Sequence, residues 1–345
     1  MRVIPFTVRE RPRSGLPPAS GVLAVAVVLA ILAVRSGSGA EPARAMTPLQ
    51  SAAYRGDAVA VERLLDAGAT PDDGNDLGMT PLMYAAGATP VIDQRYAGST
   101  AVVRTLLDRG AALNAKTGNG YTALHFSAMH GNEATVRLLV ERGADVDART
   151  DHDDSALSEA VGRGFDDVVW FLLEHGASTN PREPGTDQAP LLDAISQLPR
   201  ANRSSSPEGR LDCLFRDPGE AKRKLDERER RSSIVVMMLD HGANVNVSGQ
   251  QGQTPLMMAT AANDRWLVRA LLDRGANPNV KARAMADGTA LILAAQWADP
   301  SIVRALLDRG AASDPRDSFG KTATDYATEL GRDDVLEILA ECCKG

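Results

Sequence analysis

The chain has 345 residues, of which 43% are hydrophobic and 24% charged, an ordinary composition for a protein with a buried core. Only 4% are aromatic, so we expect a core of Ala, Leu and Val. The formal net charge is −7, and the first forty residues carry five Arg against one Glu, so the rest is more acidic still. This charge argues against nucleic acid or an anionic membrane as the main partner, because both require a basic surface.

The first forty residues have the three parts of a secretory signal peptide. Four Arg within residues 1–13 precede an unbroken apolar run at residues 21–34, and the small residues Ser38 and Ala40 follow. This order is typical of a signal that is removed after export. The alternative is a retained anchor, because residues 14–34 carry no charge and are long enough to span a membrane. We therefore expect a periplasmic or extracellular protein, with anchoring in the inner membrane by residues 14–34 as the alternative.

Two short phrases recur in fixed phase along residues 47–345. The first is Thr-Pro-Leu, Thr-Ala-Leu or a weaker copy, and it begins at Thr47, Thr80, Thr122, Ser155, Ala189, Thr254, Thr289 and Thr322. The second is Leu-Leu-Asp-x-Gly-Ala or a close variant, and its glycine is Gly68, Gly110, Gly143, Gly176, Gly242, Gly275 or Gly310. The shortest spacing between these glycines is 33 residues and it recurs, so the sequence indicates a 33-residue repeat.

Each copy has residues that begin and end a pair of helices. Thr caps the first helix, and Pro fits its first turn, where no backbone hydrogen bond is lost. Val102, Val103 and Leu106 show how the second phrase gives the second helix a buried stripe. Gly110 suits the left-handed residue that ends this helix. One such unit cannot bury its apolar face alone, so we expect neighbouring units to stack.

The two phrases resemble the ankyrin repeat, whose pattern begins T-P-L-H-x-A-A and ends L-L-x-x-G-A-x-x-N. The best copy runs from Thr122 to Ala148. The resemblance implies an all-α repeat solenoid, a stack of helix-turn-helix units with β-hairpin fingers, over residues 41–345. It implies about eight repeats, at residues 47–79, 80–121, 122–154, 155–188, 189–253, 254–288 and 289–321, with a C-terminal cap at 322–345.

Two repeats are longer than this pattern. The second holds an insertion near residues 87–97, and the fifth holds a longer one near 198–229. Within the longer insertion, the run Asp-Pro-Gly-Glu at residues 217–220 has the order of an N-cap, a first-turn Pro and a capping-box acid. This order favours a charged helical arm from Pro218 to Leu239, and a solvated loop is the alternative. Insertions in a solenoid project from one face and often carry function.

The sequence shows no constellation of catalytic residues. It has no Gly-x-Ser-x-Gly elbow and no phosphate-binding Gly-Lys-Ser/Thr loop, so we expect no enzyme activity, cofactor or metal. His125 stands at the His of the T-P-L-H pattern, where the family uses it to bond neighbouring turns. His152 lies in an acidic finger turn that we expect to be solvated. Cys213, Cys342 and Cys343 lack zinc-ligand spacing, and both free thiols and a disulfide from Cys213 to one of the other two stay open.

The resemblance implies binding through variable positions at the finger tips and on the exposed part of the first helices. The finger positions are Leu77, Met79, Asn119, Tyr121, Gln251, Gln253, Phe319 and Lys321. The helix positions are Tyr54, Arg55, Met129, His130, Arg163, Gln296 and Trp297. Exposed aromatic and Met side chains in a row are typical of protein-binding surfaces.

We therefore expect a monomeric adaptor that docks a protein partner outside the cytoplasm. Two rival functions remain. One is a membrane-tethered structural scaffold, if the apolar segment is retained. The other is an enzyme that uses the insertion at 198–229 as a flap over an active site.

Overall fold

The computed structural model describes residues 46–88, 98–180, 189–197 and 232–342. The expected export segment, the insertion at 198–229, most of the insertion near 87–97, Cys213 and Cys343 lie outside these ranges. Of the expected arm from Pro218 to Leu239, only the part from residue 232 onward is described, and residues 232–240 are helical. Within the described ranges, no helix is both long enough and apolar enough to cross a lipid bilayer.

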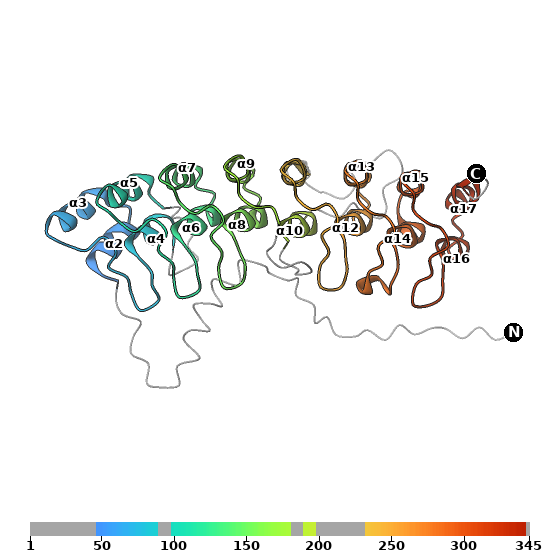
Figure 1. Ribbon diagram of the computed structural model, residues 1–345, viewed down its shortest axis with the longest axis horizontal. Coiled ribbons are helices and arrows are strands. Elements are labelled where there is room, and N and C mark those ends of the chain that lie inside the picture. The colour runs from blue at the N-terminus through green and yellow to red at the C-terminus, as the bar shows by residue number, and fades with distance from the viewer. Residues whose placement is uncertain (1–45, 89–97, 181–188, 198–231, 343–345) are drawn as a thin grey trace, which may run out of the picture.

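Helices in two rows form an elongated stack, with loops projecting from one side (Figure 1). The row next to the loops consists of short inner helices: α2 (Pro48–Tyr54), α4 (Pro81–Ala85), α6 (Ala123–Met129), α8 (Ala156–Arg163), α10 (Pro190–Ser196), α12 (Pro255–Ala261), α14 (Ala290–Trp297) and α16 (Ala323–Glu329). The other row consists of outer helices: α3 (Ala58–Asp66), α5 (Thr100–Asp108), α7 (Glu133–Glu141), α9 (Asp166–Glu174), residues 232–240, α13 (Arg265–Asp273), α15 (Pro300–Asp308) and α17 (Asp333–Cys342). This arrangement confirms the predicted all-α repeat solenoid.

The inner helices begin as the sequence predicts. The Thr47 hydroxyl accepts a hydrogen bond from the Gln50 amide at 3.2 Å, and the Gln50 side chain accepts one from the Thr47 amide at 3.0 Å. Ser155 caps α8 in the same way, at 3.1 Å from the Ser158 amide. Two otherwise unpaired backbone donors are thereby satisfied at each helix start. At the end of α5, Gly110 has a φ of +85°, the left-handed conformation expected there.

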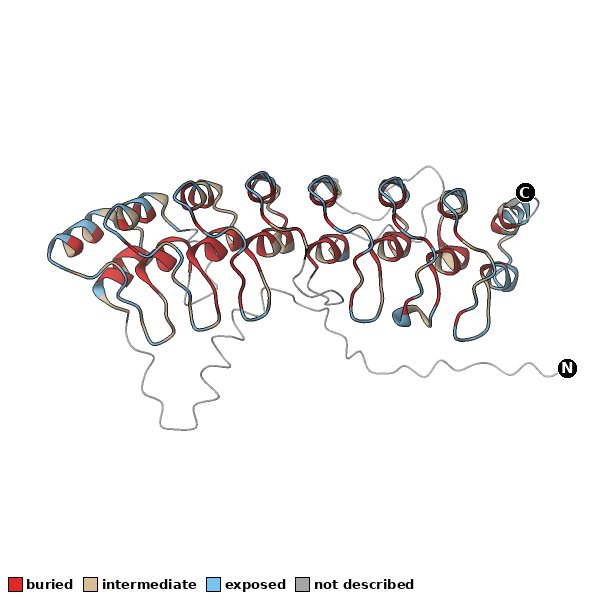
Figure 2. Cartoon of the chain, in the orientation of Figure 1, coloured by how far each residue is buried: buried red, intermediate tan, exposed pale blue. Residues whose placement is uncertain are grey.

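Buried residues lie where the two rows of helices face each other and where successive repeats meet (Figure 2). Leu106, Leu139 and Leu271, which belong to the predicted outer-helix stripes, are fully buried. Small residues such as Ala85 and Ala294 are also fully buried, and they let neighbouring inner helices pack closely. Because each helix pair packs mainly on the next pair, stability in this fold is the sum of local interfaces.

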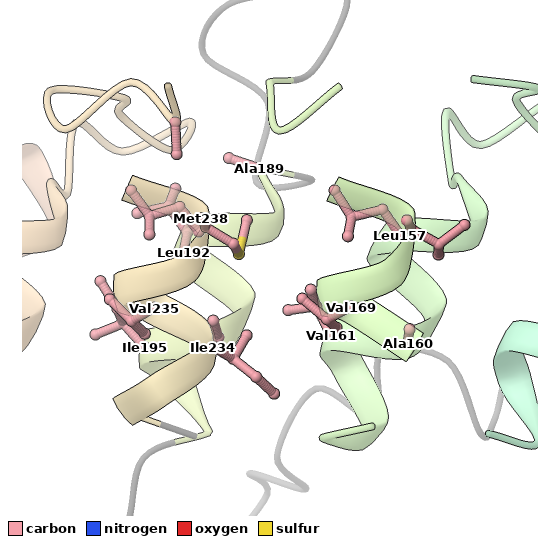
Figure 3. Close-up of a cluster of buried hydrophobic side chains, with 14 of the residues drawn as sticks. Leu157, Ala160, Val161, Val169, Ala189, Leu192, Ile195, Ile234, Val235 and Met238 are labelled. Carbon is pink, nitrogen blue, oxygen red and sulfur yellow. The ribbon is translucent and has the colours of Figure 1, made fainter. Parts of the chain in front are cut away.

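The core is continuous across the longer insertion. Leu192 and Ile195 of α10 pack with Val235 and Met238 of the helix at residues 232–240, beside the equivalent cluster of α8 and α9 (Figure 3). α10 also contacts α8 on one side and α12 on the other. The fifth repeat therefore keeps the register of the stack although its two helices are far apart in sequence.

A ladder of side-chain hydrogen bonds joins successive repeats at the base of the loops. In each bond, an Asn or Asp side-chain oxygen accepts from a backbone N–H of the next repeat, at 2.7–2.9 Å. The pairs are Asp72 with Ala112, Asn114 with Asp145, Asp147 with Ser178, Asn180 with Asn244, Asn246 with Asn277, and Asn279 with Ala312. The bond from Asn244 to Asn180 shows that the ladder continues past the longer insertion.

Ion pairs between neighbouring outer helices form a second, exposed series. They join an acidic residue near the end of one outer helix to the Arg one repeat later: Asp66 with Arg109, Asp108 with Arg142, Asp240 with Arg274, and Asp273 with Arg309. At the equivalent place, His241 Nε2 lies 3.3 Å from the Glu174 carboxylate. Exposed pairs of this kind contribute little to stability individually, so the buried core and the ladder are the main links between repeats.

Candidate partner-binding surface

The loops between repeats that the structure describes form stacked fingers on either side of residues 181–188. Their backbones are bonded to one another: the Gly118 N–H donates to the Leu77 carbonyl at 3.0 Å, and the Asp151 N–H donates to the Asn119 carbonyl at 3.0 Å. The same contact joins Ala284 to Gln251 at 3.2 Å. Paired strand residues in the described fingers are limited to two isolated antiparallel bridges, Arg149 with Ser155 and Ala282 with Gly288. Backbone hydrogen bonds therefore hold neighbouring described fingers to each other, in addition to the bonds within each finger.

The residues expected to bind a partner differ widely in exposure. Three are exposed: Arg55, Gln251 and Phe319. Ten are partly buried: Tyr54, Leu77, Met79, Asn119, His130, Arg163, Gln253, Gln296, Trp297 and Lys321. Two are buried: Tyr121 and Met129. Phe319, at 72% exposure, is the most exposed large apolar side chain of the set.

The expectation that Tyr121 and Met129 are exposed was wrong. Tyr121 is only 5% exposed, because its ring stacks on Phe126 at a centroid distance of 5.7 Å and meets the edge of His125 at 5.6 Å. Met129 is 4% exposed. α6 packs between α4 and α8, and all seven of its residues are buried, so this helix leaves Met129 no free face.

At the N-terminal end of the stack, the surface is built from aromatic and polar groups. The Tyr54 and Tyr84 rings meet edge to face at 6.4 Å. Arg55 donates to the Ser51 hydroxyl at 3.0 Å, and the Met79 carbonyl accepts from the Gln50 side chain at 3.1 Å. The ring contact joins α2 to α4, and the Gln50 bond joins α2 to the finger that precedes α4.

At the C-terminal end, a charged and aromatic group surrounds Tyr326. Lys321 Nζ lies 5.2 Å from the Tyr326 ring centroid and pairs with Glu329 at 2.6 Å. The Tyr326 hydroxyl donates to Asp317 at 2.6 Å, and this bond raises the pKa of Tyr326 to about 12. Phe319, at the tip of this finger, is exposed to solvent.

A buried carboxylate lies near the middle of the inner row. Glu159 of α8 is 7% exposed, and its Oε2 lies 3.9 Å from Arg163 Nε, which is too far for a hydrogen bond. Burial is the main cause that raises the pKa of Glu159 to about 7, and Asp154 and Asp193 raise it further, while Arg163 opposes them. The Glu159 carboxyl therefore changes charge near neutral pH.

The sequence analysis missed Glu159, although a signal was available. It occupies the fifth position of the repeat, where Phe126 stands in the preceding repeat and Met258 and Leu293 in later ones, although Asp193 and Ser51 stand there in two others. An ionisable residue at a position that is apolar in several repeats is a candidate for a perturbed pKa. Comparing the repeats with one another, position by position, would have found it.

Two histidines of the preceding repeat, His125 and His130, form hydrogen bonds within the fold. His125 is fully buried and neutral: its Nδ1 accepts from the Thr122 amide at 3.2 Å, and its Nε2 donates to the Asp154 carbonyl at 3.2 Å. Burial lowers the pKa of His125 to about 4. His130 Nδ1 donates to the Phe126 carbonyl at 2.9 Å, and burial also lowers its pKa. His125 thus bonds neighbouring turns, as the sequence indicates.

The outer helices offer a less promising pocket. It measures about 290 Å³, lies between α13 and α15, and is lined partly by Arg269, Arg304 and Arg309. Arg304 pairs with Glu341 at 2.7 Å, and Arg309 pairs with Asp273, so most of this charge is used within the fold. In the part of the chain that the structure describes, no group of His, Cys, Asp and Glu side chains could hold a metal ion.

Comparison with known proteins agrees with this architecture. A family model described as ankyrin repeats, in three copies, matches residues 94–183, 228–282 and 283–345. An ankyrin repeat-containing protein of Treponema pallidum is 44% identical over 46 residues, which are 13% of this chain and 15% of that protein. Ankyrin repeat, SAM and basic leucine zipper domain-containing protein 1 of Mus musculus is 53% identical over 45 residues, or 13% and 10% of the two chains. The matches thus span only a small part of either relative.

Solved structures resemble a larger part of the chain. The ankyrin repeat domain of Bcl-3, described as a unique member of the IkappaB protein family, has 27% identity and a TM-score of 0.54, covering 76% of this chain and 98% of that one. An ankyrin repeat domain from Acinetobacter baumannii AYE has 22% identity and a TM-score of 0.50, covering 64% and 96%. The second likeness concerns the fold alone.

Proposed function

The chain belongs to the ankyrin-repeat family, and on that premise we propose that it is an adaptor that binds a protein partner through its finger tips and inner helices. Ankyrin-repeat domains are generally protein–protein interaction modules, and the fold is typically non-catalytic. The partner-binding role of the individual residues belongs to the proposal.

The observation that carries the proposal is the bonding between neighbouring described fingers, the last of which presents Phe319. Hydrogen bonds between neighbouring fingers hold their backbones in place, so little conformational entropy is lost when a partner docks. Phe319 is 72% exposed, and an aromatic side chain held on an ordered loop is the usual kind of binding anchor. Gln251, also exposed, adds a polar group on an earlier finger.

Partly buried groups of the inner helices extend this surface. Gln296 and Trp297 lie at the end of α14, and Arg163 lies at the end of α8. Trp is enriched among residues that dominate binding energy. A partner that spans several repeats would contact the finger tips and these helix ends together.

The proposal is tested by comparing two double variants of the full chain. Phe319→Ala with Trp297→Ala removes aromatic groups from the proposed surface, whereas Trp170→Ala with Trp266→Ala removes the exposed Trp side chains of outer helices α9 and α13. We expect the first to weaken capture of partners from a cell envelope extract by about tenfold or more, with unchanged helical content. The second should bind like the parent. Loss of capture only in the outer-helix variant would show that the binding surface lies elsewhere.

We also propose that the protein acts outside the cytoplasm. The support is the order of charged, apolar and small residues in the first forty residues. Cell fractionation with N-terminal sequencing tests this: the mature chain should begin close to Glu41 or Met46 and leave the cytoplasm. An intact chain retained in the membrane fraction would instead favour the tethered scaffold, and a soluble cytoplasmic chain that still begins at Met1 would refute both.

A further inference from the structure

We propose that residues 211–215, in the longer insertion, dock on the outer helices over two exposed tryptophans. Three of these residues, Leu211, Leu214 and Phe215, form an apolar group in a stretch that is otherwise mostly polar. Residues 211–215 lie outside the described ranges, whereas both tryptophans and the helices that carry them lie within. The receiving surface is on the side of the stack away from the fingers (Figure 1), so it is separate from the proposed partner-binding surface.

The two tryptophans are large apolar side chains that the fold leaves in solvent. Trp170 of α9 is 46% exposed and Trp266 of α13 is 56% exposed. α9 and α13 are the two neighbours of the helix at residues 232–240 in the outer row (Figure 1). The insertion, residues 198–231, ends where this helix begins. The exposed tryptophans therefore lie on both sides of the place where the insertion enters the outer row.

The apolar character of this place differs from that of the other repeats. Six residues before the glycine that ends the outer helix, five of the seven repeats have a charged residue: Glu62, Arg104, Arg137, Arg269 and Arg304. The other two have Trp170 and Val236, on neighbouring outer helices. The charged position is thus replaced by an apolar one beside the insertion and at neither end of the stack.

The insertion is long enough to reach this surface. The equivalent connection between α6 and α7 is only residues 130–132. Trp266 is the second residue of α13, and packed helices lie about 8–10 Å apart, so the insertion ends about 10 Å from the turn that bears Trp266. α9 and α13 are two such spacings apart, about 20 Å, and five extended residues span about 15 Å. With their side chains, residues 211–215 can touch both tryptophans.

A separate protein is a poorer fit for this surface. A stable interface between two proteins buries at least about 1,000 Å², whereas the exposed part of each tryptophan is on the order of 100 Å². The helix between them also presents the exposed polar residues Ser233 and Asp240. The insertion needs less area, because both of its ends are joined to the stack and its docking is intramolecular.

Docking requires the chain to turn back before it reaches residue 232. A straight helix from Pro218, which the sequence favours, would put Phe215 about 20 Å or more beyond residue 232. At that distance Phe215 could not contact Trp266. The straight arm and the docked segment therefore exclude each other, and one measurement separates them.

Acrylamide quenching of tryptophan fluorescence in the full chain measures the docking. Trp297→Phe is present in every sample, so that Trp170 and Trp266 supply the signal. The triple variant Leu211→Ser with Leu214→Ser and Phe215→Ser should raise the quenching constant by about twofold, since docking on apolar side chains would cover about half of their exposed area. Deleting residues 200–228 should give the same rise. Leu225→Ser, from the charged run of the same insertion, is the matched control and should behave like the parent.

Equal quenching of the parent, the triple variant and the deletion, with helical content retained, would overturn the inference and favour the straight arm. A rise with Leu225→Ser as large as with the triple variant would also overturn it, because the contact would then not belong to residues 211–215.

Proteolysis gives a second readout that leaves the insertion unchanged. Arg210 and Arg216 flank the docking residues, so trypsin should cut there about threefold faster or more in Trp170→Ala with Trp266→Ala than in the parent. Trp297→Ala should be cut at the parent rate. Equal rates for the double variant and the parent would refute docking on the tryptophans.

Discussion

Changing Glu159 to Gln should remove a pH dependence of stability that the parent protein has. The pKa of Glu159 is about 7 in the folded chain and 4.5 for an unburied Glu side chain. Because the folded state binds the proton more tightly, the stabilising effect of this group is fully present below pH 4.5. It is lost as the pH rises through 7, where the buried carboxyl has to ionise.

The size of the effect follows from the difference between the two pKa values. Each pKa unit corresponds to about 1.4 kcal/mol, so the complete loss amounts to about 3 kcal/mol. Most of it, about 2–3 kcal/mol, falls between pH 5 and pH 8. Glutamine has nearly the same shape and no charge, so Glu159→Gln should lack this term. Its stability relative to the parent should therefore improve by about 2–3 kcal/mol between pH 5 and pH 8.

Urea unfolding followed by circular dichroism measures this difference at the two pH values. Other groups that titrate, such as Asp154, are common to both proteins and largely cancel in the comparison. Glu141→Gln serves as the control, because it removes the same charge from an exposed position of outer helix α7. If Glu159→Gln also gives the same difference from the parent at pH 5 and pH 8, Glu159 is ionised throughout, and the reasoning from burial is wrong.

Three further predictions concern the stack. Leu139→Ala should cost about 2–5 kcal/mol in urea unfolding, because Leu139 is fully buried; parent-like stability would refute the packing described. Gly120→Ala should cost about 1–3 kcal/mol more than Gly143→Ala. Both glycines have positive φ, but an added Cβ at Gly120 would meet Thr150 Cα at 2.9 Å, whereas at Gly143 nothing lies within 4 Å; equal losses in thermal melts would contradict this. Deleting residues 200–228 should leave circular dichroism and melting close to those of the parent, and global unfolding would show that the deleted segment belongs to the core.

The sequence predicts the helices well because the signals for them are local. A Thr hydroxyl caps the residue three positions later, as at Thr47 and Gln50, and a Gly such as Gly110 ends a helix by its own backbone freedom. Neither signal depends on what lies beside the repeat. The apolar stripe containing Leu106 also follows from the sequence, since its period fixes the face that is buried.

Exposure is harder to predict, because it depends on the neighbouring repeats. Tyr121 and Phe319 both belong to finger positions, yet they are 5% and 72% exposed. Tyr121 stacks on Phe126, whereas Phe319 is bare at its finger tip. Glu159 is a second example. Burial raises its pKa, and Asp154 and Asp193 of adjoining elements raise it further. The sequence of one repeat alone does not show that these groups lie together.

The hydrogen-bond ladder has a practical consequence for engineering this chain. The bond between Asn180 and Asn244 closes at 2.8 Å although these residues are 64 positions apart, and the bond between Asn114 and Asp145 closes at 2.9 Å over 31 positions. The packing and the hydrogen bonds between repeats are therefore kept although a long segment separates α10 from the helix at residues 232–240 in the sequence. A reporter or a second folded domain inserted between α10 and the helix at residues 232–240 would therefore be attached at a fixed position along the stack. The fingers on either side would keep their spacing.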